Sequence, residues 1–163
     1  MQRRAWLVAL AGASALAGCG FQLRRAPELP FKTLHLSGFK PTSPMGVALR
    51  RALAGAPTTR LVEGRAQAEA IFEVLGDADE KSVVAYTSSA QVRELQLRSR
   101  LVFQLQSASG RELIGRTEIV QSRDMSYKER DALAKEQEEQ LLFRAMQDDI
   151  ALQVVRRLAA IKP

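Results

Sequence analysis

Alternation of apolar and polar residues marks the first element of the folded part of the chain. Residues 31–39 alternate in this way, as a half-buried strand does. A helix is expected next, because Ser43 suits an N-cap and Pro44 suits the first helical position. Gly55 is expected to close it. Its apolar residues recur at intervals of three and four and so share one side: Met45, Ala48, Leu49, Ala52 and Leu53.

The middle of the chain is rich in β-forming residues. Strands are predicted over residues 70–75 and 82–90, with a loop over residues 76–80. The clearest strand runs from Val92 to Ser107 and leads through a turn into the second arm of a hairpin over residues 112–122. One face of this long strand is expected in the core and the other in water. Its core face carries Leu95, Leu97, Leu101, Phe103 and Leu105.

A long C-terminal helix has the strongest local pattern. Ser126 and Glu129 have the spacing of a capping box, and Asp131 suits the first turn. The pattern predicts an apolar stripe and leaves Gln147 outside it. The stripe consists of Phe143, Met146, Ile150, Val154, Leu158 and Ile161.

Together these elements predict an α+β fold. Each helix has one apolar side, and so do the strands, which favours a two-layer sandwich. We expect a mixed sheet of about four strands with two helices packed on one face, and the other face free for a partner. The length suits a single domain over residues 31–163.

The N-terminus has the order of a secretory signal. Arg3 and Arg4 precede an apolar run over residues 5–17, which is shorter than the about 20 residues that a membrane-spanning helix needs. The sequence Leu16-Ala17-Gly18-Cys19 follows and resembles the lipobox of bacterial lipoproteins. Residues 1–18 are therefore predicted to be a cleaved signal peptide, and residues 19–30 a lipidated tether.

Cys19 is the predicted lipid attachment site. The alternative is an unmodified thiol within a targeting segment. The resemblance implies S-diacylglycerol and N-palmitoyl groups on Cys19, and three chains anchor a protein far more firmly than one. It also implies outer-membrane sorting, because Gly20 stands where aspartate would retain a lipoprotein in the inner membrane. The sole cysteine leaves no disulfide. No other cofactor is expected.

The mature chain is moderately basic. Loss of residues 1–18 removes two arginines and lowers the formal net charge from +6 to +4. Basic residues concentrate in residues 24–65 and 81–123, and such stretches can bind phosphate groups. In the periplasm a phosphorylated glycolipid is the expected partner, and nucleic acid is not. The alternative is a solvated basic surface that improves solubility.

The residues give little support to an enzyme. The only histidine, His35, lies within a predicted strand and has no serine, cysteine or metal-ligand partner at a recognisable spacing. No Gly-rich phosphate loop follows a strand, and no Cys or His pair is present for a transition metal. We therefore predict a protein without catalytic or metal sites.

Two parts of the sequence resemble a known family. Residues 19–24 read Cys-Gly-Phe-Gln-Leu-Arg, and residues 132–135 read Ala-Leu-Ala-Lys, continuing through Asp149 to a basic end before Leu158. These features are similar to the LptE/RlpB family of lipopolysaccharide-assembly lipoproteins. The resemblance implies a two-layer domain that plugs the lumen of the outer-membrane barrel LptD, assists its assembly and takes part in lipopolysaccharide insertion. The alternative is a lipoprotein that tethers another envelope complex without binding lipopolysaccharide.

The resemblance also implies a lipopolysaccharide-binding residue, Lys135. A second basic position of the family falls near residues 86–89, where this chain has no Arg or Lys. Arg93 is near enough to substitute. Arg98 and Arg100 are expected on the polar face of the same strand, so we expect Lys135 to bind the phosphorylated head of lipopolysaccharide with help from Arg93, Arg98 or Arg100. The alternative for Lys135 is a helix-surface pair with Glu139 at i+4.

Overall fold

The computed structural model describes residues 28–161 of the 163-residue chain. The predicted signal peptide and Cys19 lie outside these residues. The elements follow in the order β1 (Thr33–Ser37), α2 (Pro44–Ala54), β2 (Arg60–Leu61), β3 (Ala70–Tyr86), β4 (Val92–Ser107), β5 (Glu112–Ser126) and α3 (Ala132–Ala159). Short 3₁₀ turns, η1 and η2, cover Arg65–Gln67 and Glu129–Asp131.

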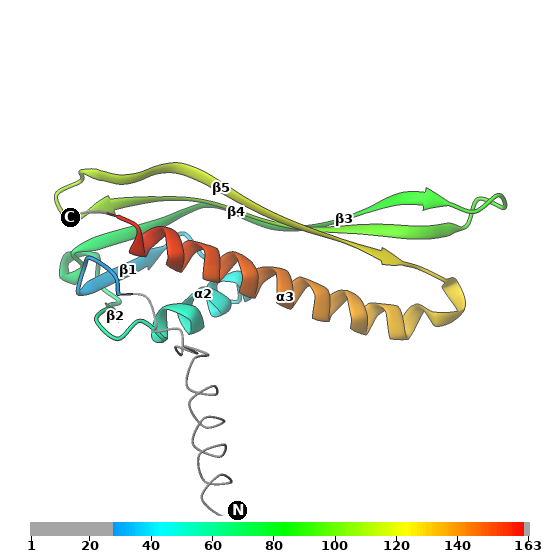
Figure 1. Ribbon diagram of the computed structural model, residues 1–163, viewed down its shortest axis with the longest axis horizontal. Coiled ribbons are helices and arrows are strands. Elements are labelled where there is room, and N and C mark those ends of the chain that lie inside the picture. Colours follow the sequence, from blue (N-terminus) through cyan, green and yellow to red (C-terminus); the bar gives the residue numbers. More distant parts are fainter. Residues whose placement is uncertain (1–27, 162–163) are drawn as a thin grey trace, which may run out of the picture.

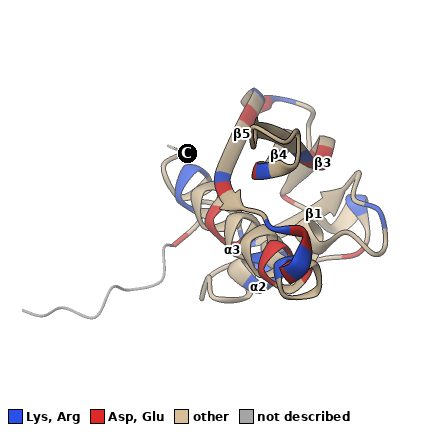
Figure 2. Ribbon diagram, turned by 90° about the vertical axis from the view of Figure 1, so that its right-hand side faces the viewer, with Lys and Arg blue, Asp and Glu red and all other residues tan. Residues whose placement is uncertain are grey.

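The strands form one mixed sheet in the order β2-β1-β3-β4-β5. β1 runs parallel to β2 and β3, and the remaining pairs are antiparallel. Both helices lie on one face of the sheet, and the other face is uncovered (Figures 1 and 2). The predicted α+β two-layer fold is therefore confirmed. The sheet has five strands and not about four, because β2 is a two-residue strand too short to give a periodic signal.

β3 is one continuous strand, so the loop predicted over residues 76–80 is wrong. The segment contains several polar residues of low β propensity, but β4 pairs with it along its whole length and overrides that preference. The register shifts between Val74 and Gly76, which leaves Leu75 as the extra residue of a β-bulge. β5 likewise runs four residues past the predicted end at Ser122.

The bulge changes which residues of β3 face the helices. Before it, Phe72 and Val74 are buried. After it, the side chains that reach the helices are polar. Asp77 accepts a hydrogen bond from Ser43, Asp79 accepts one from Gln147 at 2.7 Å, and Lys81 lies 2.8 Å from Glu139. The helix layer is therefore attached to the second half of β3 by polar bonds.

The apolar core lies where β1, the first half of β3 and the second half of β4 meet both helices. Phe72 and Phe103 stack at its centre, with ring centroids 4.7 Å apart. Ser43 caps α2 by accepting a hydrogen bond from the Gly46 backbone N–H, as predicted. Leu29, which the sequence suggested as part of the tether, is also buried in this core.

α3 confirms four of the six residues of the predicted stripe but not the predicted start; Phe143 is half-buried, and Ile161 follows the end of the helix. Met146, Ile150, Val154 and Leu158 are all fully buried. The helix begins at Ala132 with Asp131 as an N-cap that makes no side-chain hydrogen bond, so the capping box is wrong. Ser126 is instead the last residue of β5. The pairing with β4 continues one residue further, where the Tyr127 backbone N–H donates to the Arg93 carbonyl at 2.8 Å.

Gln147 was expected on the outer side of α3, and this is also wrong. Only 4% of the residue is exposed, and its amide donates to Asp79. The polar residues of β3 that follow the bulge provide a buried hydrogen-bond partner for Gln147 between α3 and the sheet. Among residues 28–161, no helix is long and apolar enough to cross a membrane.

Replacing Gly38 by alanine tests how closely β1 and β3 approach. A Cβ at Gly38 would lie 2.3 Å from the Val74 carbonyl oxygen, whereas one at Gly110 would meet nothing within 4 Å. Both glycines have positive φ, so alanine costs each about 1–2 kcal/mol in backbone conformation. We expect Gly38→Ala to lower the free energy of unfolding by a further ~1–3 kcal/mol through the clash. Urea unfolding measures both variants, and equal losses would contradict the close approach.

Candidate functional site

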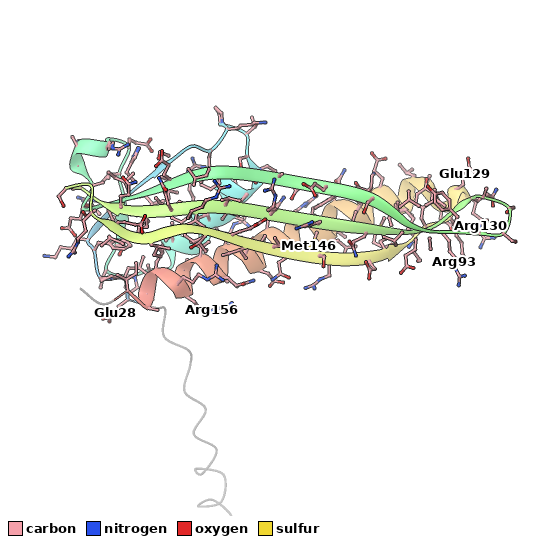
Figure 3. All side chains as sticks on the ribbon, turned by 90° about the horizontal axis from the view of Figure 1, so that it is seen from above. Glu28, Arg93, Glu129, Arg130, Met146 and Arg156 are labelled. Atoms are coloured by element: carbon pink, nitrogen blue, oxygen red, sulfur yellow. The ribbon has the colours of Figure 1, made fainter. Side chains whose placement is uncertain are left out.

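An open groove lies at one end of the elongated molecule. It is formed where the turn between β3 and β4 meets the connection from β5 to α3. Arg93, Glu129 and Arg130 mark this end in Figure 3, while Glu28 and Arg156 lie at the opposite end. We call it the distal groove; it is lined by residues of the turn from Thr87, by the start of β4, and by residues 126–130.

Hydrogen bonds fix the shape of the turn beside the groove. The Thr87 backbone N–H donates to the Gln91 carbonyl at 2.8 Å, and the Gln91 N–H donates to the Thr87 hydroxyl at 3.1 Å. Ala90 adopts a positive φ of 60°, as tight turns require. The bond from Tyr127 to the Arg93 carbonyl then joins the two walls of the groove.

The groove carries cations that are not neutralised internally. Its lining includes Arg93, Lys128 and Arg130, together with Glu94 and Glu129. Arg130 lies 3.6 Å from Asp131. Within residues 28–161, neither Arg93 nor Lys128 forms an ion pair, so both are available to an anionic ligand.

Lys135 stands at the rim of the groove. Its ammonium group donates to the hydroxyl of Ser126, which lines the groove, at 3.3 Å and to the Glu138 carboxylate at 2.8 Å. Its side chain is only 18% exposed. The alternative partner, Glu139, binds Lys81 from β3, so the ion pair that Lys135 makes on the helix is with Glu138 at i+3. Lys135 is thus held beside Ser126, at the edge of the groove, by neighbours on two elements.

Arg98 and Arg100 lie on a different surface. They alternate along β4 with the buried residues Leu97, Ser99 and Leu101, so their side chains project from the uncovered face of the sheet. Arg100 lies 3.9 Å from Glu118 of β5. At about 3.3 Å per residue, the two arginines are roughly 16 to 23 Å along the strand from Arg93. Of the three arginines that were candidates to help Lys135, only Arg93 therefore lies at the groove.

The sequence reasoning missed Lys128 and Arg130. They follow β5 in a segment with no periodicity, so no pattern placed them on a face. The available signal was their position just before the Ala-Leu-Ala-Lys motif that contains Lys135.

The contacts of His35 are those of a residue with a structural role. Its Nδ1 lies 3.1 Å from the Val62 carbonyl oxygen, within hydrogen-bond distance. The described part of the chain contains no group of three or more His, Cys, Asp or Glu side chains arranged to hold a metal ion. What the distal groove offers is cations and hydroxyl groups, a combination that binds phosphate by charge-assisted hydrogen bonds.

Comparison with known sequences gives a family match and a relative. The family described as "LptE: Lipopolysaccharide-assembly" matches residues 31–158. The LPS-assembly lipoprotein LptE of Photorhabdus laumondii subsp. laumondii is 26% identical over 149 residues, which cover 89% of this chain and 79% of that protein.

Comparison with solved structures gives the same fold. Lipoprotein B of Nitrosomonas europaea is 30% identical with a TM-score of 0.72, covering 86% of this chain and 91% of that one. Rare lipoprotein B of Shewanella oneidensis is 22% identical with a TM-score of 0.67, covering 79% and 95%. The minor lipoprotein of Acinetobacter baumannii is 22% identical with a TM-score of 0.66, covering 81% and 93%. At 22% identity the last two are evidence of a shared fold alone.

Proposed function

This chain belongs to the LptE family of lipopolysaccharide-assembly lipoproteins, and from that premise we propose that its distal groove binds the phosphorylated head of lipopolysaccharide. Its role is in lipopolysaccharide assembly. The observation that carries the groove assignment is the pair of cations without internal partners, Arg93 and Lys128, next to Lys135.

Several cations acting together are needed at such an exposed site. A charge-assisted hydrogen bond to phosphate is roughly twice as strong as a neutral one, but water and salt screen a single exposed contact. Arg93 and Lys128 come from opposite walls of the groove, and Lys135 approaches from α3. A bound phosphate group would therefore meet positive charge from three segments of the chain.

We propose further that the domain plugs the lumen of the LptD barrel and assists its assembly. The uncovered face of the sheet supports this, because it is polar and has no second layer (Figure 2). On that face Arg98 of β4 lies opposite Glu80 of β3, and Arg100 lies 3.9 Å from Glu118 of β5. These groups suit a hydrated protein surface, which gives the two arginines a role in partner contact and not in the groove.

Anchoring completes the proposal. Acylated Cys19 would hold the protein at the outer membrane, with the domain on the periplasmic side or inside the barrel. We assign no catalytic chemistry to the domain. Co-purification of the lipidated protein tests the partner: recovery of LptD in about equal amount supports the plug, and its absence favours a tether of another envelope complex.

Charge reversal at Arg93 tests the groove. We expect Arg93→Glu to weaken lipopolysaccharide retention by about tenfold at low salt, equivalent to ~1.4 kcal/mol, with a smaller effect at high salt. Lys135→Glu should act in the same direction. Retention is measured on the affinity-captured full-length protein in a non-ionic detergent, at two salt concentrations.

Arg98→Glu is the matched control for this measurement. It makes the same charge change on the same strand, but on the uncovered face of the sheet. Its retention should stay close to that of the parent. If Arg98→Glu weakens retention as much as Arg93→Glu, then the net charge of the domain binds the ligand and the groove has no special part.

A further inference from the structure

The hairpin that joins β3 to β4 ends in a segment without charge. From Ser82 to Val92 the chain has no Asp, Glu, Lys or Arg, although 26% of all residues are charged. This segment extends past the end of β5 and past the start of α3 (Figure 1). We call it the hairpin tip.

The hairpin tip exposes apolar side chains close together. Val83, Val84 and Tyr86 are 37%, 48% and 62% exposed. Single exposed apolar residues are common on protein surfaces, whereas here three occur within four residues of an uncharged hairpin. Tyr86 also has an apolar ring body and a polar hydroxyl, a combination favoured at boundaries between apolar and aqueous surroundings.

The hairpin tip shares its turn with the distal groove. Thr87 follows Tyr86 directly. Both Thr87 and Gln91, at the other side of the turn, line the groove that contains Arg93 and Lys128. Apolar side chains and one available cation, Arg93, therefore lie on one short stretch of chain, and Lys128 lines the opposite wall of the groove. The chemistry that complements both is an amphiphile with an anionic head and hydrocarbon chains.

We propose that Val83, Val84 and Tyr86 contact the acyl chains of the lipid whose phosphorylated head lies in the distal groove. This inference rests on the function proposed above and adds a second recognition element to it. Head and chains would bind on either side of one turn.

The location of the hairpin tip favours contact with a single lipid molecule rather than with the surface of the anchoring membrane. Glu28, the first described residue, lies at the end of the molecule opposite Arg93 (Figure 3). The hairpin tip thus points away from the end at which the described part of the chain begins.

A tryptophan reporter at the hairpin tip tests the contact. Trp6 is the only tryptophan and lies in the predicted signal peptide, so Tyr86→Trp, with Trp6→Phe as a precaution, leaves one fluorophore. The full-length lipoprotein is placed in phosphatidylcholine vesicles and given either intact lipopolysaccharide or the same material fully de-acylated. Retention of each is measured in parallel, with protein-free vesicles as background.

We expect intact lipopolysaccharide to shift the Tyr86→Trp emission to the blue, and the de-acylated form to leave it unchanged. Leu152→Trp is the control, because Leu152 is 50% exposed on α3; its emission should not change. Tyr86→Ser should weaken retention of the intact form about tenfold, the size expected when one buried apolar side chain is lost, and Tyr86→Phe should retain it.

The outcomes separate the two proposals. If intact lipopolysaccharide is retained but the emission at position 86 does not move, the acyl contact is wrong and the groove assignment stands. An equal shift at positions 86 and 152, or a shift with the de-acylated form, also overturns the acyl contact. If the parent protein retains no lipopolysaccharide, the proposed function fails and this inference fails with it.

Discussion

Ile150→Asp is expected to lower the free energy of unfolding by about 4 kcal/mol or more. Ile150 is completely buried in the core between α3 and the sheet. The substitution removes apolar contacts, which costs about 2–5 kcal/mol for a buried isoleucine, and it places a carboxylate where no partner is available. Urea unfolding of the parent and the variant gives the difference. A marginal domain would not fold at all.

Leu152→Asp is the matched control for Ile150→Asp. It introduces the same charge two residues further along the same helix, at a side that is 50% exposed. We expect a loss below about 1 kcal/mol, because surface substitutions rarely cost more. If the two variants unfold alike, the apolar side of α3 has been assigned wrongly.

Gln147→Asp cannot serve as the neutral control that the sequence pattern suggested. The Gln147 amide donates to the Asp79 carboxylate, and a second carboxylate there would face the first without a donor between them. Its stability should therefore fall between those of Leu152→Asp and Ile150→Asp.

Cys19→Ala is expected to abolish lipid attachment. Cys19 is the only cysteine of the chain, so alanine leaves no thiol to accept the diacylglycerol group. Each buried methylene contributes ~0.8 kcal/mol to membrane binding, and three acyl chains together make release from the membrane very slow. Metabolic labelling with radioactive palmitate measures the effect, and the variant should carry no label and remain uncleaved or mislocalised. Equal labelling of the variant and the parent would refute acylation at this residue.

Gly20→Asp separates attachment from sorting. It leaves the cysteine in place, so the palmitate label should persist. Aspartate after the acylated cysteine is the inner-membrane retention signal implied by the lipobox resemblance, so the labelled protein should move to the inner-membrane fraction. Labelled protein that stays in the outer-membrane fraction would show that residue 20 does not direct sorting here.

Local pattern predicted the elements that depend on local chemistry. Ser43, Pro44 and Gly55 set the start and end of α2, because capping involves only neighbouring backbone groups. The alternation along β4 predicted its buried face, since side chains of a strand alternate whatever lies across from them. Lys135 was found through its motif, and nothing in the periodicity distinguished it from other helix-surface lysines.

The candidate site depended on arrangement in three dimensions. Arg93, Arg98 and Arg100 follow one another on the same strand, but Arg98 and Arg100 project from the uncovered face, whereas Arg93 lies in the groove. Lys128 joined the site only because the connection after β5 returns beside the turn at Thr87. Separations of this kind are set by which strands pair and where each pair ends, and the spacing of residues along the chain does not contain that information.

By itself, the sequence determined both helices, the buried face of β4 and the two-layer α+β class, because each follows from periodicity or from chemistry within a few residues. The lipidation signal, read in the same way from neighbouring residues, stays a prediction. The tertiary structure decided what depended on a partner distant in sequence. β4 holds residues 76–80 of β3 in a strand despite their low propensity, and the bulge at Leu75 turns polar residues toward the helices. That polar row gives Gln147 its place under α3. The free energy of strand pairing, summed over a long ladder, exceeds the weak conformational preferences of single residues. Contacts between residues distant in sequence therefore prevailed where they conflicted with local propensity.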